Sequence, residues 1–121
     1  MCQVLGLKSD SIPRIATPFG GGLGHSGLVC GAISGACMAI GLVRGRRSAD
    51  DPRDPAYDAA QKLVELFVEE MKSPLCPELT GFDLRTPESV KEFRESGVRD
   101  RVCAPAIVLA ARLAVDMLKG D

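Results

Sequence analysis

One segment of the chain shows a clear helical spacing of apolar and polar positions. It begins at Asp54-Pro55, a cap followed by proline at the first helical position, and it ends at Ser73-Pro74. Between these limits apolar residues recur every three or four positions, at Ala56, Ala60, Leu63, Val64, Phe67, Val68 and Met71. The spacing predicts a long amphipathic helix with one face packed into a core.

A second segment is apolar throughout. Ile15–Val43 carries no formal charge apart from a possible one on His25. Pro18 and the glycines after it interrupt the segment, so we expect its helix to run from about Gly27 to Leu42, with Ser26 as the N-cap. A helix with so little charge is typical of one buried on all sides in a small bundle. The segment therefore predicts a glycine-rich loop that leads into a buried central helix.

Prolines and glycines divide the C-terminal half. The stretch 74–81 is too short and too rich in proline for a strand, and we expect a turn there. Thr86–Gly97 combines a cap, a proline and a closing glycine, which predicts a short polar helix. A last apolar helix carries Cys103 in its first turn and continues to Leu118. No segment alternates with period two, so the sequence predicts an all-α fold.

The composition fits one small globular domain. A chain of 121 residues, 45% apolar and 26% charged, can form a single core, and we expect one domain over residues 1–121, a small helical bundle of about four to five helices. Fifteen basic and sixteen acidic residues leave a net charge of −1, which gives no reason to expect nucleic acid as a partner.

The uncharged segment is also too short to predict a membrane span. A span needs about 20 apolar residues in one helix, whereas roughly 17 remain from Gly27 to Val43, with four glycines among them. The five cysteines are odd in number, widely spread and without a Cys-x-x-Cys pair, and no signal peptide is recognisable at the start. This cysteine usage fits a reducing cytoplasm better than a secreted disulfide scaffold.

Cys30 is the strongest candidate for chemistry. It stands where a glycine-rich loop meets the predicted central helix, and the positive end of a helix favours a thiolate. Cys37, two turns further along, is more simply explained as a small buried apolar residue. His25 is the only histidine, and a solvent-exposed loop histidine is the default interpretation, with a base for the thiol or a metal ligand as alternatives.

The glycines around Cys30 have three possible roles. The spacing Gly22–Gly27 matches the dinucleotide fingerprint G-x-G-x-x-G, but no strand precedes it, so we do not expect a nucleotide. The free N–H groups of the loop could instead hold a small anion or a persulfide. Within the predicted helix, glycines four residues apart leave a bare ridge that a neighbouring backbone could approach. The candidate cofactor-binding glycines are Gly20, Gly21, Gly22, Gly31 and Gly35.

These features together resemble a known family. Phe19–Gly22, Cys30–Gly35, Cys76–Leu79 followed by Gly81, and a last cysteine at Cys103 are similar to the C_GCAxxG_C_C family of putative redox-active proteins. The resemblance extends from about Leu5 to Val115. It implies a helical fold and a site formed by three of the family's four characteristic cysteines, namely Cys30, Cys76 and Cys103.

The chain departs from the family pattern at its start. Family members usually carry their first cysteine at the beginning of an N-terminal helix, and Cys2 is too close to the glycine loop to be that residue. We therefore expect this chain to lack the family's N-terminal helix. A bundle without one helix would expose apolar surface, which predicts self-association, for example as a homodimer.

Three functions remain open from the sequence. The resemblance favours thiol–disulfide or electron-transfer chemistry, with Cys30 as the activated thiolate, Cys76 or Cys103 as its resolving partner, and a redox partner that the sequence does not identify. The alternatives are a cysteine-ligated metal or iron–sulfur site, completed by Cys2, Cys37 or His25, and a non-catalytic helical interaction module. No haem motif and no constellation typical of a nuclease, kinase or hydrolase is present.

Overall fold

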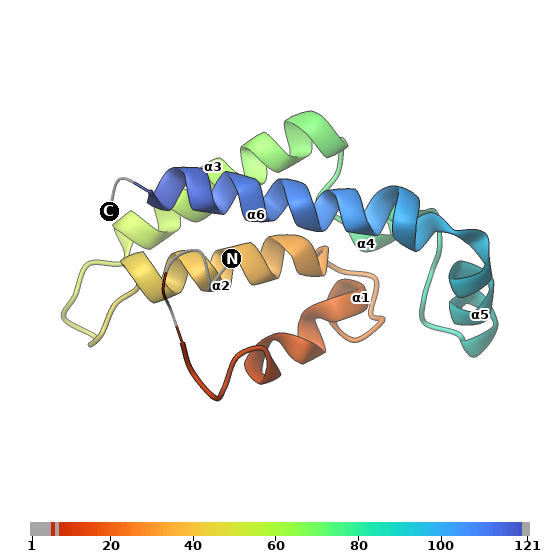
Figure 1. Ribbon diagram of the computed structural model, residues 1–121, viewed down its shortest axis with the longest axis horizontal. Helices are drawn as coiled ribbons and strands as arrows, with labels where there is room; N and C mark the ends of the chain where they lie inside the picture. The colour runs from red at the N-terminus through yellow and green to blue at the C-terminus, as the bar shows by residue number, and fades with distance from the viewer. Residues whose placement is uncertain (1–5, 7, 120–121) are drawn as a thin grey trace.

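Three long helices lie side by side and form the body of the molecule (Figure 1). In this computed structural model, which describes residue 6 and residues 8–119, they are α2 (Gly31–Arg44), α3 (Asp54–Met71) and α6 (Ala104–Leu118), and each contacts the other two. The predicted all-α bundle is confirmed, since the described residues contain several helices and no strand.

The remaining elements are short. A 3₁₀ helix and a single turn pass along α2, and two further helices and a π-helical turn precede α6 (Figure 1). Two of them, α1 and α4, are single turns that the sequence did not predict as helices. The described residues thus contain six α-helices, three long and three short, in agreement with a small bundle. These elements are η1 (Arg14–Phe19), α1 (Gly20–Leu23), α4 (Cys76–Thr80), α5 (Pro87–Ser96) and η2 (Arg99–Cys103).

The core lies between α2, α3 and α6. In α3 the predicted apolar face is confirmed, because Leu63 and Phe67 are completely buried. In α6 the buried face combines alanines, such as Ala110 and Ala114, with Leu109 and Leu118, whereas Ile107 and Val108 are exposed. Small alanine side chains favour a close approach of α6 to its neighbours in the core.

The central helix is α2. It packs against α3 and α6 on one side and against η1 and α1 on another. Its last turn emerges from the bundle, where Leu42 is exposed, and Arg44 ties that turn to α6 by donating from its guanidinium to the carbonyl of Met117 at 2.8 Å. Within the described part of the chain, no helix is both long and apolar enough to cross a membrane.

Two predicted boundaries are wrong, and both lie at the same end of the molecule. The helix expected from Gly27 begins at Gly31, because the preceding residues are extended and pair with the segment around Leu75. The turn expected over 74–81 contains α4, which starts at Cys76 and ends at Gly81 with φ +77°. Hydrogen bonds between these distant segments, which the local pattern does not reveal, therefore decide where both helices begin.

The expected absence of an N-terminal helix concerns residues that lie outside the described part of the chain. Residues 1–5 and 7 include Cys2, so neither that prediction nor the role of Cys2 is tested. Self-association and a cytoplasmic location also stay predictions.

Candidate functional site

Three of the cysteines influence one another electrostatically at one end of the bundle. Cys30 precedes the first residue of α2, Cys76 is the first residue of α4, and Cys103 is the last residue of η2. Burial and then the charge of Cys30 raise the pKa of both Cys76 and Cys103, and Cys103 also raises the pKa of Cys76. All three thiols are free. The three cysteines that the sequence singled out therefore stand on neighbouring elements, since α4 (Cys76–Thr80) contacts η2 (Arg99–Cys103) and the residue before Cys30 pairs with the residue before Cys76. Their joint role as a site stays a prediction.

Cys37 does not belong to this group. Burial alone raises the pKa of its thiol, with no contribution from another cysteine. Its side chain packs against the hydrophobic core from the middle of α2. Cys37 is half-buried, and the absence of an influence from another cysteine agrees with the interpretation of Cys37 as a packed apolar residue.

Backbone pairing sets the relative position of Cys30 and Cys76. Val29 and Leu75 face each other in an isolated antiparallel bridge. On either side of it, the N–H of Cys30 donates to the carbonyl of Pro74 at 2.8 Å, and the N–H of Cys76 donates to the carbonyl of Leu28 at 2.9 Å. Because side chains alternate along an extended segment, Cys30 and Cys76 lie on the same face as diagonal neighbours.

A left-handed turn lies next to this pairing and is joined to it by a hydrogen bond from Leu28 to Gly22. All five residues from Gly21 to His25 have positive φ values, between 63° and 72°, and the N–H of Gly24 donates to the carbonyl of Gly20 at 2.9 Å. Glycine adopts this conformation without strain, and the run Gly20–Gly24 therefore explains how the chain forms such a turn despite the non-glycine residues Leu23 and His25.

Gly22 lies directly against Cys76. A Cβ at Gly22 would come within 2.8 Å of the Cβ of Cys76 and within 2.9 Å of the backbone nitrogen of Leu28. The carbonyl of Gly22 also accepts a hydrogen bond from that same nitrogen at 3.0 Å. Since any side chain at residue 22 would push Cys76 away, this glycine is needed for the position of the thiol.

Gly31 has a similar role at the start of α2. A Cβ there would lie 2.9 Å from the carbonyl oxygen of Phe19, whereas Gly20 and Gly35 have open space around a Cβ. A neighbouring backbone therefore approaches the predicted ridge of small residues at Gly31. It does not do so at Gly35, where a Cβ would meet open space, and Gly27 lies before the helix and is not part of the ridge. Whether any of these glycines binds a cofactor stays a prediction.

A π-helical turn carries Cys103. The N–H of Ala104 donates to the carbonyl of Arg99, five residues earlier, just before Pro105 removes the next backbone donor. Such turns displace a helical residue from its regular direction and occur frequently at functional sites. Arg99 lies at the start of this turn, and its positive charge lowers the pKa of Cys103 against the raising effects of burial and Cys30.

The sequence did not reveal the polar residues that surround Cys76. The hydroxyl of Thr80 donates to the carbonyl of Cys76 at 2.9 Å, and Thr80 lowers the pKa that burial raises. The buried hydroxyl of Ser73 donates to the Glu78 carboxylate and accepts from the N–H of Leu75 at 3.1 Å. A threonine four residues after Cys76 was the available signal, because this spacing places both on one face of α4.

Other predicted candidates lie apart from the thiols or outside the described part of the chain. His25 is exposed in the left-handed turn, as the default interpretation expected. Among the described residues, no group of three or more His, Cys, Asp or Glu side chains is arranged to hold a metal ion. Among the described residues no strand precedes the glycine loop, so the structural context that a dinucleotide fingerprint requires is missing.

Comparison with known proteins gives one match. The family model described as "Putative redox-active protein (C_GCAxxG_C_C)" matches residues 1–117. No curated protein and no solved structure matches the chain.

Proposed function

The chain belongs to the C_GCAxxG_C_C family of putative redox-active proteins, and on this basis we propose that it exchanges electrons through a dithiol, with Cys30 as the nucleophile and Cys76 as the resolving thiol. The observation that carries the proposal is the backbone pairing of the segments that carry Cys30 and Cys76, and the electrostatic influence of Cys30 on Cys76 and Cys103 supports it. Cys37 lies within α2, the helix that begins directly after Cys30, and no other cysteine contributes to its raised pKa. It therefore serves as the internal reference for the other thiols.

Cys30 is suited to the role of nucleophile by its place at the N-terminus of α2. Its carbonyl accepts from the N–H groups of Ile33 and Ser34, which places Cys30 at the N-cap of the helix. The positive end of the helix stabilises an anion there, and a half-buried position leaves the sulfur accessible to a disulfide.

Cys76 is suited to the role of resolving thiol. Burial and then the charge of Cys30 raise its pKa, which favours the protonated form of this thiol. Diagonal neighbours in an antiparallel pair are about 7–8 Å apart between Cα atoms, slightly beyond the usual span of a disulfide. A small movement that brings the two paired segments closer together would therefore allow a disulfide between Cys30 and Cys76.

The proposed reaction is a two-step exchange with a disulfide substrate. The Cys30 thiolate attacks one sulfur of the substrate, forming a mixed disulfide and releasing the other half as a thiolate. Cys76 then attacks the Cys30 sulfur and releases the second half, and the proton of the Cys76 thiol goes to a released thiolate. The protein loses two electrons and forms a Cys30–Cys76 disulfide, while the substrate disulfide gains the two electrons. A reducing dithiol restores the protein by the reverse exchange.

Cys103 is a third thiol within electrostatic reach of both. Burial and then the charge of Cys30 raise its pKa, which favours the protonated thiol, and the charge of Arg99 opposes that shift. We propose that Cys103 can accept the disulfide from Cys30 as an alternative resolving thiol, which would leave Cys76 free for a second exchange.

The test is the reduction of bis(2-hydroxyethyl) disulfide, with an excess dithiol reductant to regenerate the protein. We expect Cys30→Ser to abolish the protein-dependent rate. In a single turnover without the reductant, the double variant Cys76→Ser with Cys103→Ser should stop at a mixed disulfide on Cys30, detected by mass spectrometry. Cys37→Ser is the matched control from the same helix and should retain the rate. Full activity of Cys30→Ser would refute the proposal.

A further inference from the structure

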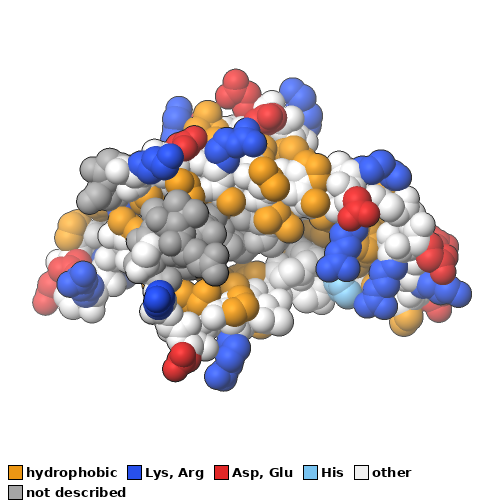
Figure 2. All heavy atoms as spheres, in the orientation of Figure 1, with side chains coloured by type: hydrophobic (Ala, Val, Ile, Leu, Met, Phe, Trp, Pro, Cys, Tyr) orange, Lys and Arg blue, Asp and Glu red, His pale blue; other side chains and the backbone are white. Residues whose placement is uncertain are grey.

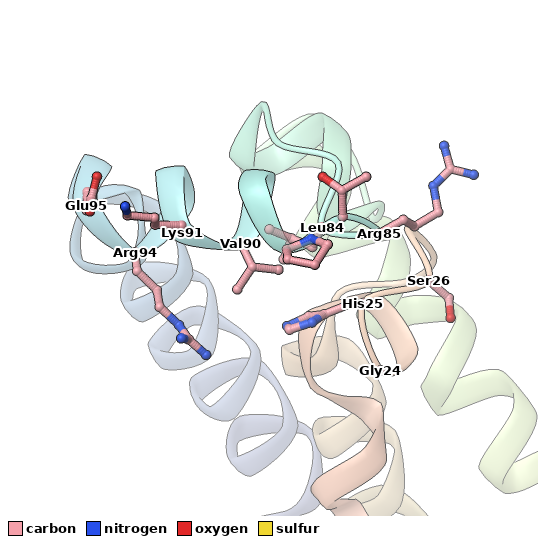
Figure 3. Close-up of a pocket in the computed structure, with 11 residues that line it drawn as sticks. Gly24, His25, Ser26, Leu84, Arg85, Val90, Lys91, Arg94 and Glu95 are labelled. Atoms are coloured by element: carbon pink, nitrogen blue, oxygen red, sulfur yellow. The ribbon is translucent and has the colours of Figure 1, made fainter.

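An open groove of about 690 Å³ lies between the left-handed turn and α5. In Figure 3, His25 projects from the turn toward Val90 on α5, and Arg94 extends from the same helix. Leu84, which is buried, contributes to the apolar part of the groove, and contact between the rings of Phe93 and Phe82, with centroids 5.8 Å apart, holds α5 in place.

The groove carries unneutralised positive charge. Lys91 and Arg94 line it, and neither has an ion pair with any described residue. Arg85, on the same rim, is already matched by Asp83 at 2.7 Å, an interaction that lowers the pKa of that carboxyl to about 2. Glu95 is the single lining carboxylate. Figure 2 shows basic side chains gathered around the histidine at this end of the molecule.

The groove and the thiols lie against the same turn. A Cβ at Gly21 would collide with the His25 ring, which lines the groove, and a Cβ at the next residue, Gly22, would collide with Cys76. Two consecutive residues of one turn therefore contact the groove on one side and the thiol group on the other. The turn thus links the groove to the segment that positions Cys76.

We propose that this groove binds the acidic groups of the disulfide substrate, so that the protein acts preferentially on small disulfides that carry carboxylates. This inference rests on the proposed dithiol function. Lys91 and Arg94 attract the carboxylates, and Leu84 and Val90 contact the methylene groups between them and the sulfurs. The electron transfer itself follows the balanced exchange given above.

The first test compares three disulfides of similar size and different charge. These are 3,3′-dithiodipropionate with two negative charges, bis(2-hydroxyethyl) disulfide with none, and cystamine with two positive charges. Each rate of mixed-disulfide formation at Cys30 is divided by the rate for the chain unfolded in urea, which removes differences in intrinsic reactivity. At low salt we expect about a tenfold preference for the dianion over the dication, and salt should reduce it. Equal ratios for all three disulfides would overturn the inference.

Two variants locate the preference. Arg94→Gln and Lys91→Gln, both at exposed positions on α5, should each reduce the advantage of the dianion about threefold. The matched control is Lys62→Gln, an exposed lysine on α3 outside the groove, which should leave the advantage unchanged. An equal loss in all three variants would assign the preference to net charge and overturn the groove as its source.

A binding measurement separates failure of the groove from failure of the redox function. Suberate has the length of dithiodipropionate with methylene groups in place of sulfur, and it can be titrated into Cys30→Ser, which lacks the nucleophile. Because His25 is the only histidine, its ring signals in the NMR spectrum report directly on the groove. We expect these signals to shift with suberate and to stay unchanged with 1,8-diaminooctane. Unchanged signals with both ligands would overturn the groove, while loss of the two-thiol exchange in Cys30→Ser would still support the redox function.

Discussion

The helical body of this molecule and the end that carries the thiols are stabilised in different ways. The bundle body is held by side-chain volume, with Leu63 and Phe67 of α3 completely buried against α2 and α6. The thiol end is held by backbone geometry, through a left-handed turn, an isolated antiparallel bridge and a π-helical turn. A change in the body should therefore alter stability without altering the thiols, whereas a change at the thiol end should alter both.

Phe67→Ala is the largest expected effect in the body. Removing a fully buried aromatic side chain should lower the free energy of unfolding by about 3–5 kcal/mol, measured by urea denaturation. Conditions that keep the variant folded should leave the pKa difference between Cys76 and Cys37 as in the parent chain. A change in that difference would contradict the separation of the two ends.

Gly31→Ala is the corresponding change at the thiol end. The new Cβ would lie 2.9 Å from the carbonyl oxygen of Phe19, and backbone atoms cannot move aside cheaply, so we expect a loss of about 1–3 kcal/mol. Gly35→Ala is the matched control one turn along the same helix, where a Cβ meets open space. There the gain in helix propensity should stabilise the chain by about 0.5–1 kcal/mol. Equal effects of the two changes would refute the close approach at Gly31.

The thiol end should also make stability depend on alkaline pH. The pKa values of Cys76 and Cys103 are raised above the ordinary 9.0, so the folded state holds their protons longer than the unfolded state. The stabilisation is fully present below the unfolded pKa and is lost as the pH rises through the folded values. We expect the free energy of unfolding to fall above about pH 9, and the fall to be shallower in Cys76→Ala. An unchanged slope would contradict the assignment.

The smallest expected effect is a change in pKa that is confined to two thiols, Cys76 and Cys103. In Cys30→Ser the charge that raises the neighbouring pKa values is absent, so the pKa of Cys76 and of Cys103 should fall while burial keeps them above the ordinary range. The pKa of Cys37 should stay the same, since burial alone raises it. The rate of iodoacetamide alkylation against pH, followed by mass spectrometry of each peptide, measures all three thiols in one sample.

The sequence predicts the body better than the thiol end. The spacing of apolar residues over 54–71 reports directly on a helix packed against a core, and the cap at Thr86 and the glycine at Gly97 bound α5 as expected. The start of α2 was misplaced because Leu28 to Cys30 pair with a segment more than forty residues away. Local periodicity contains no information about such pairing.

The site was only partly visible for the same reason. Its three cysteines could be chosen from the family resemblance, and the glycine run indicated an unusual turn. The turn's left-handed conformation, however, extends over Leu23 and His25, which do not favour it. The groove beside His25 depends on α5, a helix whose sequence alone is typical of a solvent-exposed polar element.

The most direct test of a shared thiol site is disulfide mapping after oxidation with one equivalent of a mild oxidant. Peptide mass spectrometry of the monomeric fraction should find a bond between Cys30 and Cys76, with Cys37 still free. A first bond that involves Cys37, or no bond among Cys30, Cys76 and Cys103, would contradict the grouping of these three thiols.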